Sequence, residues 1–486
     1  MKTIFTILVL ISFLGLGKST YCQTKVFTHP DKILHLSSQD SSSYFGAPML
    51  NDAYLMNTLV KGNINNDAYD DIIVIAPDGK NPQGVTVGIT YIYLGSPTGI
   101  GTTPSQIIYG NRSVAVPHTG CVLGDFNHDG HADIVIGYEG YNVQGSVTQG
   151  YAACFFGKAD NSGIDTTQRL LFEGLSNSGN FAHAIVKGDM NGDGTDDLII
   201  SAIHDGEYAG RIYCYFGGSS MDAIPDLMFS RSGSTILGYV SLKVADINGD
   251  GLDDIVTLDM PGWNGCNLQV DVFAGNAVIN LEPSFFKGFN GMNFLQATDI
   301  NGDGFADVIG TSNNGLNCSA NSPYKYITVI KGRANYSMDS TVLIPFLGEL
   351  ARPSNLINSV DVNNDGIKDV FISIKKSDGS IESYVFAGHP TQYINTLDTL
   401  FKFVDSDGTY GNTIENIIPA DCNGDGKPEF YGYSQMLPYK GVIFVYENIP
   451  QIEKIFFAAK PSSGNFYSIY SMNTDATNRV KLFNDN

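Results

Sequence analysis

Acidic and amide side chains recur at alternate positions of short loops in this chain. In the string DMNGDGTDD, residues 189–197, Asp189, Asn191, Asp193 and Asp197 occupy positions 1, 3, 5 and 9, and Gly194 occupies position 6. Oxygen atoms at these positions of a tight loop can surround one hard cation, because Ca²⁺ takes about 6–8 oxygen ligands in flexible geometry. Glycine suits position 6 because it tolerates a positive φ. The string therefore predicts a calcium loop.

The residues after the string exclude an EF-hand. An EF-hand needs a bidentate Glu at position 12 and a helix on each side of the loop. Position 12 here is Ile200, and the apolar run from Leu198 to Ala202 is typical of a short buried strand. The sequence thus predicts a calcium loop placed inside a β-hairpin.

The same pattern of Asp, Asn and Gly residues occurs seven times with small variations, and we number the copies loop 1 to loop 7. They are NINNDAYDD (63–71), DFNHDGHAD (125–133), DMNGDGTDD (189–197), DINGDGLDD (246–254), DINGDGFAD (299–307), DVNNDGIKD (361–369) and DCNGDGKPE (421–429). A regular period of roughly 60 residues indicates a repeat architecture.

Positions 1, 3, 5 and 9 of these loops are the predicted metal ligands. They are Asn63, Asn65, Asp67, Asp71, Asp125, Asn127, Asp129, Asp133, Asp189, Asn191, Asp193, Asp197, Asp246, Asn248, Asp250, Asp254, Asp299, Asn301, Asp303, Asp307, Asp361, Asn363, Asp365, Asp369, Asp421, Asn423, Asp425 and Glu429. Loops 2 to 6 fit the pattern best. Loop 7 closes with a longer Glu429, and loop 1 is the weakest because Asn63 and Ala68 replace Asp and Gly. We expect about five to seven structural Ca²⁺ sites.

The charge of the chain is concentrated in these loops. The formal net charge is −22, from 50 acidic and 28 basic residues, and the seven strings contain 23 of the acids. Without these 23 acids, 27 acids would face the 28 bases of the chain. The overall charge excludes a basic face for nucleic acid or an anionic membrane.

Each loop is followed by a strand, a turn, an aromatic-rich strand and a shorter segment, and a further strand enters the next loop. Four short strands in roughly 60 residues are typical of one propeller blade. The sequence therefore predicts an all-β fold, a seven-bladed β-propeller with four-stranded blades, spanning residues 23–460. Residues 461–486 are expected to form a C-terminal tail or closing segment.

The repeats resemble the FG-GAP family of β-propellers, which includes the head of integrin α subunits. The motif residues are Phe45-Gly46-Ala47-Pro48 and Ile75-Ala76-Pro77 in the first repeat, with Phe156-Gly157 and Phe216-Gly217 later, and the string YLGSPTGI (93–100) is similar to secreted members. Most loops lack the Gly-Ala-Pro element. The resemblance implies an extracellular binding or adhesion module that uses the loops on the face away from the calcium hairpins.

The ends of the chain carry separate expectations. Residues 1–22, with Lys2 followed by an apolar stretch, predict a secretory signal, and no later apolar run reaches the about 18 residues of a membrane span. We therefore expect a secreted or cell-surface protein that does not insert directly into a membrane. To close the ring, KILHL (32–36) is favoured over EKIFFAA (453–459) as the outer strand of the last blade.

Other candidate sites have simpler interpretations. The carboxylate pairs Asp70-Asp71, Asp196-Asp197 and Asp253-Asp254 could suggest acid–base catalysis, but neighbours in a loop rarely face each other. His128 and His131 are expected to be exposed loop side chains.

The remaining cysteine, tryptophan and asparagine features are equally unspecific. Cys154 and Cys214 are expected to be buried thiols, while Cys266 and Cys318 could form a disulfide. Trp263 could anchor a ligand, and Asn335-Tyr336-Ser337 is one of three glycosylation sequons.

The preferred function is a calcium-stabilised extracellular module that binds a protein or a glycan. No nucleotide, zinc or hydrolase motif indicates an enzyme. Two alternatives remain open: a lectin-like glycan-binding propeller, and a polysaccharide-acting enzyme with an active site between blades.

Overall fold

The structure is a computed structural model, and it describes the greater part of the repeat region. The described residues are 25–27, 32–35, 59–76, 79–110, 115–116, 120–140, 142–143, 146–147, 150–174, 179–205, 210–230, 235–261, 267–275, 283–290, 293–312, 326–338, 341–345, 351–363, 365–375, 381–390, 393–404, 414–434, 442–446, 454–459, 468–473 and 480–481. Phe45–Pro48, Trp263, Cys266 and Cys318, together with the predicted signal, lie outside them.

The fold is all-β, as the sequence predicts, and the described residues contain seven sheets of four or five strands. Sheet 1 consists of β3 (Leu59–Gly62), β4 (Asp71–Ala76), β5 (Ile89–Tyr93) and β6 (Gln106–Tyr109). Sheet 2 consists of β7 (Ala115–Val116), β8 (Cys121–Gly124), β9 (Asp133–Gly140), β12 (Tyr151–Phe155) and β13 (Leu170–Glu173). Sheet 3 consists of β14 (Phe181–Gly188), β15 (Asp197–Ala202), β16 (Arg211–Tyr215) and β17 (Leu227–Phe229).

The second half of the chain repeats this arrangement. Sheet 4 consists of β18 (Thr235–Ala245), β19 (Asp254–Pro261), β20 (Asn267–Phe273) and β21 (Phe285–Asn290). Sheet 5 consists of β22 (Asn293–Thr298), β23 (Asp307–Ser312), β24 (Tyr326–Ile330) and β25 (Thr341–Pro345), and the short helix η1 (Ala334–Tyr336) lies between its last two strands. Sheet 6 consists of β26 (Ala351–Val360), β27 (Asp369–Lys375), β28 (Ile381–His389), β29 (Tyr393–Val404) and β1 (Lys25–Phe27). Sheet 7 consists of β30 (Ile414–Ala420), β31 (Glu429–Ser434), β32 (Val442–Tyr446) and β2 (Lys32–His35).

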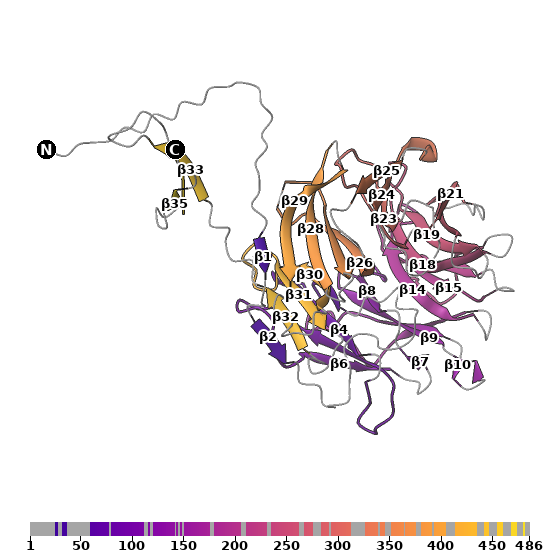
Figure 1. The fold of residues 1–486 in the computed structure, drawn as a ribbon. Coiled ribbons are helices and arrows are strands. Elements are labelled where there is room, and N and C mark those ends of the chain that lie inside the picture. Colours follow the sequence, from indigo (N-terminus) through magenta and orange to yellow (C-terminus); the bar gives the residue numbers. More distant parts are fainter. Residues whose placement is uncertain are drawn as a thin grey trace.

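Two small groups of strands complete the described chain. β10 (Asn142–Val143) and β11 (Ser146–Val147) pair antiparallel with each other, and in the sequence they lie between β9 and β12 of sheet 2. β33 (Lys454–Ala459), β34 (Ser468–Asn473) and β35 (Val480–Lys481) form a three-stranded sheet that lies apart from the others in Figure 1.

The strand that follows each loop is largely apolar, in keeping with burial on both of its faces. In β4 every residue is buried. Ile72 and Val74 pack in one core cluster with residues of sheet 7, whereas Ile73 and Ile75 pack in another with residues of sheet 2. Since successive side chains of a strand point to opposite faces, each sheet is packed between its two neighbours.

The N-terminal strand completes the last sheet, as the sequence predicts. β2 pairs antiparallel with β32, placing Ile33 opposite Phe444. Residues 454–459 instead pair with β34, so EKIFFAA does not take that place. A further strand was not expected: β1 adds to the edge of sheet 6 in parallel with β29.

Neighbouring sheets meet along the strands that lead into the loops. β3, β8, β14, β18, β22, β26 and β30 contact one another in that order, and β30 also contacts β3. Figure 1 shows the resulting fan of sheets, with β30 and β31 of the last sheet close to β4 of the first. The arrangement is propeller-like, with the seven loops leaving the same end of each first strand.

Hydrogen bonds between consecutive loops join the sheets at that end. The N–H of Asp125 donates to Oδ2 of Asp196 at 3.0 Å, and the N–H of Asp189 donates to Oδ2 of Asp253 at 2.9 Å. In both bonds the carboxylate at position 8 of one loop accepts from position 1 of the preceding loop. The two members of each carboxylate pair noted in the sequence therefore have different structural roles. The carboxylate at position 8 bonds to the neighbouring loop, and the one at position 9 bonds within its own loop.

The same bond joins the last loop to the first. Asp421 N–H donates to Oδ2 of Asp70 at 2.9 Å, and Asp70 N–H donates to the carbonyl oxygen of Asp421 at 2.9 Å. Lys61 Nζ lies 3.3 Å from the same Oδ2 of Asp70. Residues 351 positions apart thus form a joint like those between consecutive repeats.

We expect Asp70→Ala to lower the free energy of unfolding by about 1–2 kcal/mol, because it removes a charged acceptor and leaves the Asp421 N–H unbonded. Urea unfolding measures the loss, and hydrogen exchange at the Asp421 amide should become faster. The matched control is Asp160→Ala, since among the described residues this exposed carboxylate accepts from Ser162 N–H within its own turn; no measurable loss is expected there. Equal losses in the two variants would contradict a role for Asp70 in joining the ends.

Candidate metal centres

The first residue of each loop holds the turn together through its side chain, which is a carboxylate in loops 2 to 7 and the amide of Asn63 in loop 1. In loop 3, Oδ1 of Asp189 accepts hydrogen bonds from the N–H groups of Gly192 and Asp193, at 2.7 and 3.1 Å. Oδ2 accepts from Gly194 N–H at 2.9 Å. Such side-chain-to-backbone bonds are the reason Asp and Asn favour turns. The first predicted ligand therefore also shapes the loop.

Position 6 requires the left-handed backbone conformation in loops 2 to 7. Gly194, for example, has φ of 80°, and a Cβ placed there would meet no atom within 4 Å. The requirement for glycine is thus conformational rather than steric. In loop 1, Ala68 is not among the residues with positive φ, so this loop follows a different path at position 6. The sequence-based expectation that loop 1 is the weakest site gains a physical reason.

Positions 3 and 5 lie side by side on the outer turn. In loop 3, Asn191 Nδ2 donates to Oδ2 of Asp193 at 3.0 Å, and Thr195 N–H donates to Oδ1 of Asp193 at 2.8 Å. Asn191 Oδ1 accepts from Asp193 N–H at 3.0 Å. Both side chains therefore present oxygen atoms to the space enclosed by the loop.

Position 9 is a buried carboxylate and the first residue of the second strand in every sheet. In loop 3, Oδ2 of Asp197 accepts from Met190 N–H at 2.8 Å, and its Oδ1 accepts from Gly217 N–H at 2.8 Å. Gly217 ends the aromatic third strand, and a Cβ there would lie 2.3 Å from the carbonyl oxygen of Asp196. The ninth residue thus ties its loop to the third strand of its own sheet.

This tie recurs along the chain and was missed by sequence reasoning. The bond to position 2 is present in loops 1, 2, 3, 4, 6 and 7. The bond to the glycine after the third strand is present in loops 1 to 6. The glycine that usually closes the aromatic strand was the available signal, because it marks a close approach of the backbone.

Burial raises the pKa of the ninth residue in every loop. The pKa rises to about 6 for Asp71, Asp133, Asp197, Asp254 and Asp369, and to about 7 for Asp307 and Glu429. Loss of hydration is the largest cause in each case, and backbone hydrogen bonds oppose it. The other carboxylates of the same loop add to the rise. A positive charge in the loop would favour the ionised form.

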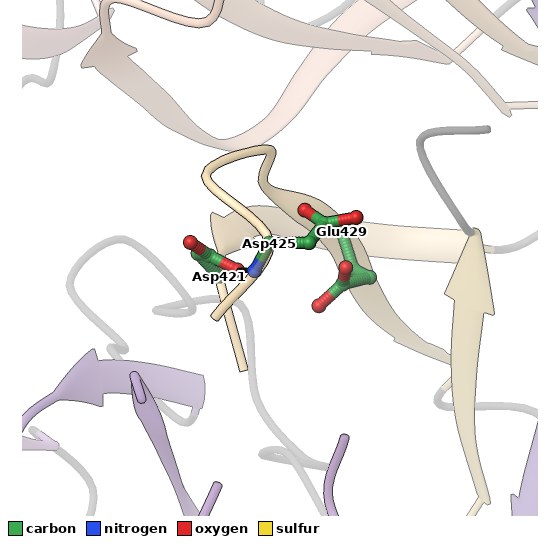
Figure 2. A group of neighbouring side chains, drawn as sticks. All are labelled: Asp421, Asp425 and Glu429. Atoms are coloured by element: carbon green, nitrogen blue, oxygen red, sulfur yellow. Dashed lines mark hydrogen bonds between the residues drawn. The ribbon is translucent and has the colours of Figure 1, made fainter. Parts of the chain in front are cut away.

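Loop 7 brings three carboxylates together. One ligand oxygen each from Asp421, Asp425 and Glu429 lies within 4.8 Å of the other two, and Figure 2 shows these side chains grouped around the turn between β30 and β31. Among the described residues, no other group of three or more His, Cys, Asp or Glu side chains has its ligand atoms this close together. The longer side chain of Glu429 allows the convergence, with Asn423 Nδ2 donating to its Oε1 at 2.6 Å.

The donor set of these loops fits a hard cation. Every predicted ligand is a carboxylate or amide oxygen, as Ca²⁺ prefers, and no thiol or imidazole points to zinc. In loop 5, Oδ2 of Asp307 is buried and has no hydrogen-bond partner in the described part of the chain. A buried carboxylate oxygen of this kind is costly unless it is compensated. In loop 7, Asp421, Asp425 and Glu429 would hold the ion.

The two histidines of loop 2 have local partners. His131 Nδ1 lies 2.7 Å from Oδ1 of Asn161, and His128 Nδ1 lies 3.3 Å from Oγ1 of Thr195 in loop 3. His128 is exposed and His131 is half-buried. The thiols of Cys154 and Cys214 are buried and free, as the sequence predicts, and burial raises their pKa.

Comparison with known proteins identifies the type of repeat. The family described as FG-GAP-like repeat matches residues 63–136 and 189–257. Integrin alpha-5 of Xenopus laevis is 28% identical over 216 residues, which are 38% of this chain and 19% of that protein. Phosphatidylinositol-glycan-specific phospholipase D of Homo sapiens is 33% identical over 144 residues, 27% of this chain and 17% of that protein.

The expected resemblance to FG-GAP repeat β-propellers is therefore confirmed: the chain carries FG-GAP-like repeats. The matches span about a fifth of the length of these relatives. Among solved structures, rhamnogalacturonan lyase YesW superposes with a TM-score of 0.43 at 13% identity, covering 80% of this chain and 71% of that one.

We expect the metal-free protein to become less stable as the pH rises from about 5 to 7.5. The ninth residues have ordinary pKa values near 4 and folded values of about 6 to 7, so their neutral forms stabilise the fold at low pH and this contribution is lost as they ionise. Thermal unfolding in EGTA across this range measures the effect. Millimolar Ca²⁺ should remove most of the decline, because a cation stabilises the ionised form. A melting temperature that rises with pH in EGTA would contradict this assignment.

We expect Glu429→Gln to weaken cation binding at loop 7 at least about tenfold, because it removes one of three converging charges. Glu429→Asp is the comparison variant: it keeps the charge but shortens the reach of the side chain, so we expect a smaller loss of affinity than with Glu429→Gln. Calcium titration against a chromophoric chelator measures the affinities. Equal weakening by both substitutions would show that side-chain length rather than charge governs this site.

Proposed function

We propose that the protein is an extracellular, calcium-stabilised, seven-bladed β-propeller that acts as a binding module for a protein ligand. The blade number is supported by the seven sheets, each with one loop, and by first strands that contact one another from β3 to β30 and back to β3. The joint between Asp421 and Asp70 supports a closed ring.

The observation that carries the calcium proposal is the convergence of Asp421, Asp425 and Glu429 in loop 7. A bound Ca²⁺ would supply the positive charge that three adjacent carboxylates lack. The residues themselves shape the turn: Asp421 accepts from the N–H groups of Asp425 and Gly426, and Glu429 accepts from Cys422 N–H. Positions 1, 3, 5 and 9 of the other loops are proposed to act in the same way.

Calcium would have a structural role in this proposal. Loop 3, for example, is bonded to its own third strand and to loop 4, so a cation that orders this loop would also order a joint between sheets. Any species that binds only the folded state stabilises it, by about 2.7 kcal/mol when the free concentration is 100 times the Kd. An ordered set of joints would hold the connections at the opposite end of the sheets in fixed positions, which favours binding.

The end opposite to the metal loops contains a separate tie between sheets 2, 3 and 4. His183 Nδ1 lies 2.8 Å from Oε1 of Glu139, and Nε2 lies 3.0 Å from the carbonyl oxygen of Tyr239. The Tyr239 ring stacks on the imidazole, with centroids 5.8 Å apart. This tie supports a rigid ligand-binding face at that end.

An extracellular location is supported by the N-terminal sequence pattern and by the resemblance to integrin α chains. In the described part of the chain, no helix is long and apolar enough to cross a membrane. The phospholipase D relative is an enzyme by its name, and its match is confined to 144 residues. We therefore favour a binding module over an enzyme.

We expect calcium-dependent binding of the mature protein on a combined array of extracellular proteins and glycans. The protein is applied in millimolar Ca²⁺ and again in EGTA, and circular dichroism checks that both samples are folded. Protein hits lost in EGTA would support the proposal. Hits confined to glycans and competed by free sugar would support the lectin alternative, and no binding by folded, calcium-loaded protein would contradict a binding module.

A further inference from the structure

One side chain from sheet 5 lies on the candidate metal loop of sheet 4. The hydroxyl of Tyr336 donates a hydrogen bond to Oδ1 of Asp254 at 2.7 Å and accepts one from Nδ2 of Asn248 at 2.7 Å. Asp254 and Asn248 occupy positions 9 and 3 of loop 4. The phenol therefore contacts two predicted ligands of one site from the following repeat, where the sequence suggested only a glycosylation sequon.

The backbone that carries Tyr336 adopts an unfavourable conformation. Asn335 and Tyr336 have φ of 57° and 55°, so two successive non-glycine residues lie in the left-handed region. Such residues persist where the surrounding structure determines them, and they are common at functional sites. Here the turn ends at Met338, which is fully buried and whose N–H donates to the carbonyl oxygen of Tyr336 at 2.8 Å.

The same segment is anchored on both neighbouring loops. Arg333 N–H donates to the carbonyl oxygen of Ile247 in loop 4 at 3.1 Å. Gly332 N–H donates to Oδ1 of Asp307 in loop 5 at 3.0 Å, and Arg333 Nη1 lies 3.5 Å from Oδ2 of Asp303. Residues 332–336 are therefore fixed between two loops, and Tyr336 has a defined position on the first of them.

Other sheets show the joint without the side chain. At the matching point of sheet 1, Ser96 N–H donates to the carbonyl oxygen of Cys422, and in sheet 3 Gly218 N–H donates to that of Phe126. These bonds correspond to the one between Arg333 and Ile247. Tyr336 is thus an addition to a backbone joint that the repeats share.

We propose that Tyr336 is a positioning residue of the loop 4 metal site, so that this site is completed by the following repeat. A bond donated to Asp254 favours its ionised form. Asn248 already has the orientation seen in loop 3: its Nδ2 donates to Oδ2 of Asp250 at 2.8 Å and its Oδ1 accepts from Asp250 N–H at 2.7 Å. The bond from Nδ2 to the Tyr336 hydroxyl adds a further contact that holds the amide in this orientation. Tyr336 thereby orients two ligands without binding the ion itself. The inference rests on the proposed calcium function of the loops.

The test compares Tyr336→Phe with Tyr109→Phe in the full mature chain. Both substitutions remove one hydroxyl and keep the ring. Tyr109 lies in β6, and among the described residues no side-chain hydrogen bond links it to a loop. EGTA-treated protein is titrated with Ca²⁺ against a chromophoric chelator. We expect Tyr336→Phe to weaken one site about tenfold while the number of sites stays the same, and Tyr109→Phe to leave every affinity unchanged.

A second comparison assigns the effect to loop 4. In an Asp254→Asn background, where loop 4 is already impaired, Tyr336→Phe should cause no further loss of affinity. Additive losses would overturn the assignment, as would unchanged calcium affinities together with an equal fall in melting temperature in Ca²⁺ and in EGTA. If wild-type protein binds no Ca²⁺, the proposed function itself fails, which is distinct from a wild type that binds and a Tyr336→Phe variant that binds equally well.

Discussion

The buried carboxylate at position 9 is the constraint on which the rest of this structure depends. In loop 3, Asp197 accepts one hydrogen bond from inside the loop and one from Gly217 at the end of the third strand. These two bonds fix the length of the turn and its height above the sheet. Because position 8 precedes it directly, the neighbouring Asp196 must point away toward the adjacent loop, where it bonds Asp125 N–H. One side chain thus sets the geometry within a sheet and the joint between sheets.

When the carboxylate at position 9 is ionised, a negative charge is buried. A bound cation or a proton would compensate this charge. Burial raises the pKa of Asp307 and Glu429 to about 7, so at neutral pH these groups lie near the balance between the neutral and ionised forms. Three carboxylates at the spacing found in loop 7 repel one another when all are ionised. All seven loops share the buried carboxylate at position 9, so under the proposed function a cation bound in each loop would compensate this charge.

Much of the fold could be predicted from the sequence because the pattern repeats. Four strands in each period, the strand that starts at position 9 and the pairing of β2 with β32 all follow from alternating apolar runs and the spacing of the loops. The parallel addition of β1 to sheet 6 could not be predicted, because three residues carry too little pattern to choose a partner strand. The pairing of β2 with β32 was accessible from sequence because residues 32–36 precede the first repeat as the outer strands of other repeats precede the next one.

The candidate sites were predictable in ligand type and less so in geometry. Alternate Asp and Asn residues define the donor set, but the sequence ranked loop 7 behind loops 2 to 6, whereas the carboxylates that converge in the described residues are those of loop 7. The reason is side-chain length: Glu429 reaches a distance that Asp does not. Tyr336 could not be found at all, since its place depends on two left-handed residues and on a contact with Asp254, 82 positions earlier.

Contacts of this kind explain why a repeat protein need not have equivalent sites. Loops 1 and 7 meet through Asp70 and Asp421, and loop 1 has lost the glycine that shapes the other turns. Its carboxylate at position 8 nevertheless retains the bond that joins neighbouring sheets. A loop can therefore lose features of the metal pattern and still be bonded to its neighbour. The joint uses backbone groups at positions 1 and 8, with a carboxylate at position 8 added in loops 1, 3 and 4, whereas the proposed cation site uses the side chains at positions 1, 3, 5 and 9. The two functions of the loop can diverge independently from one repeat to the next.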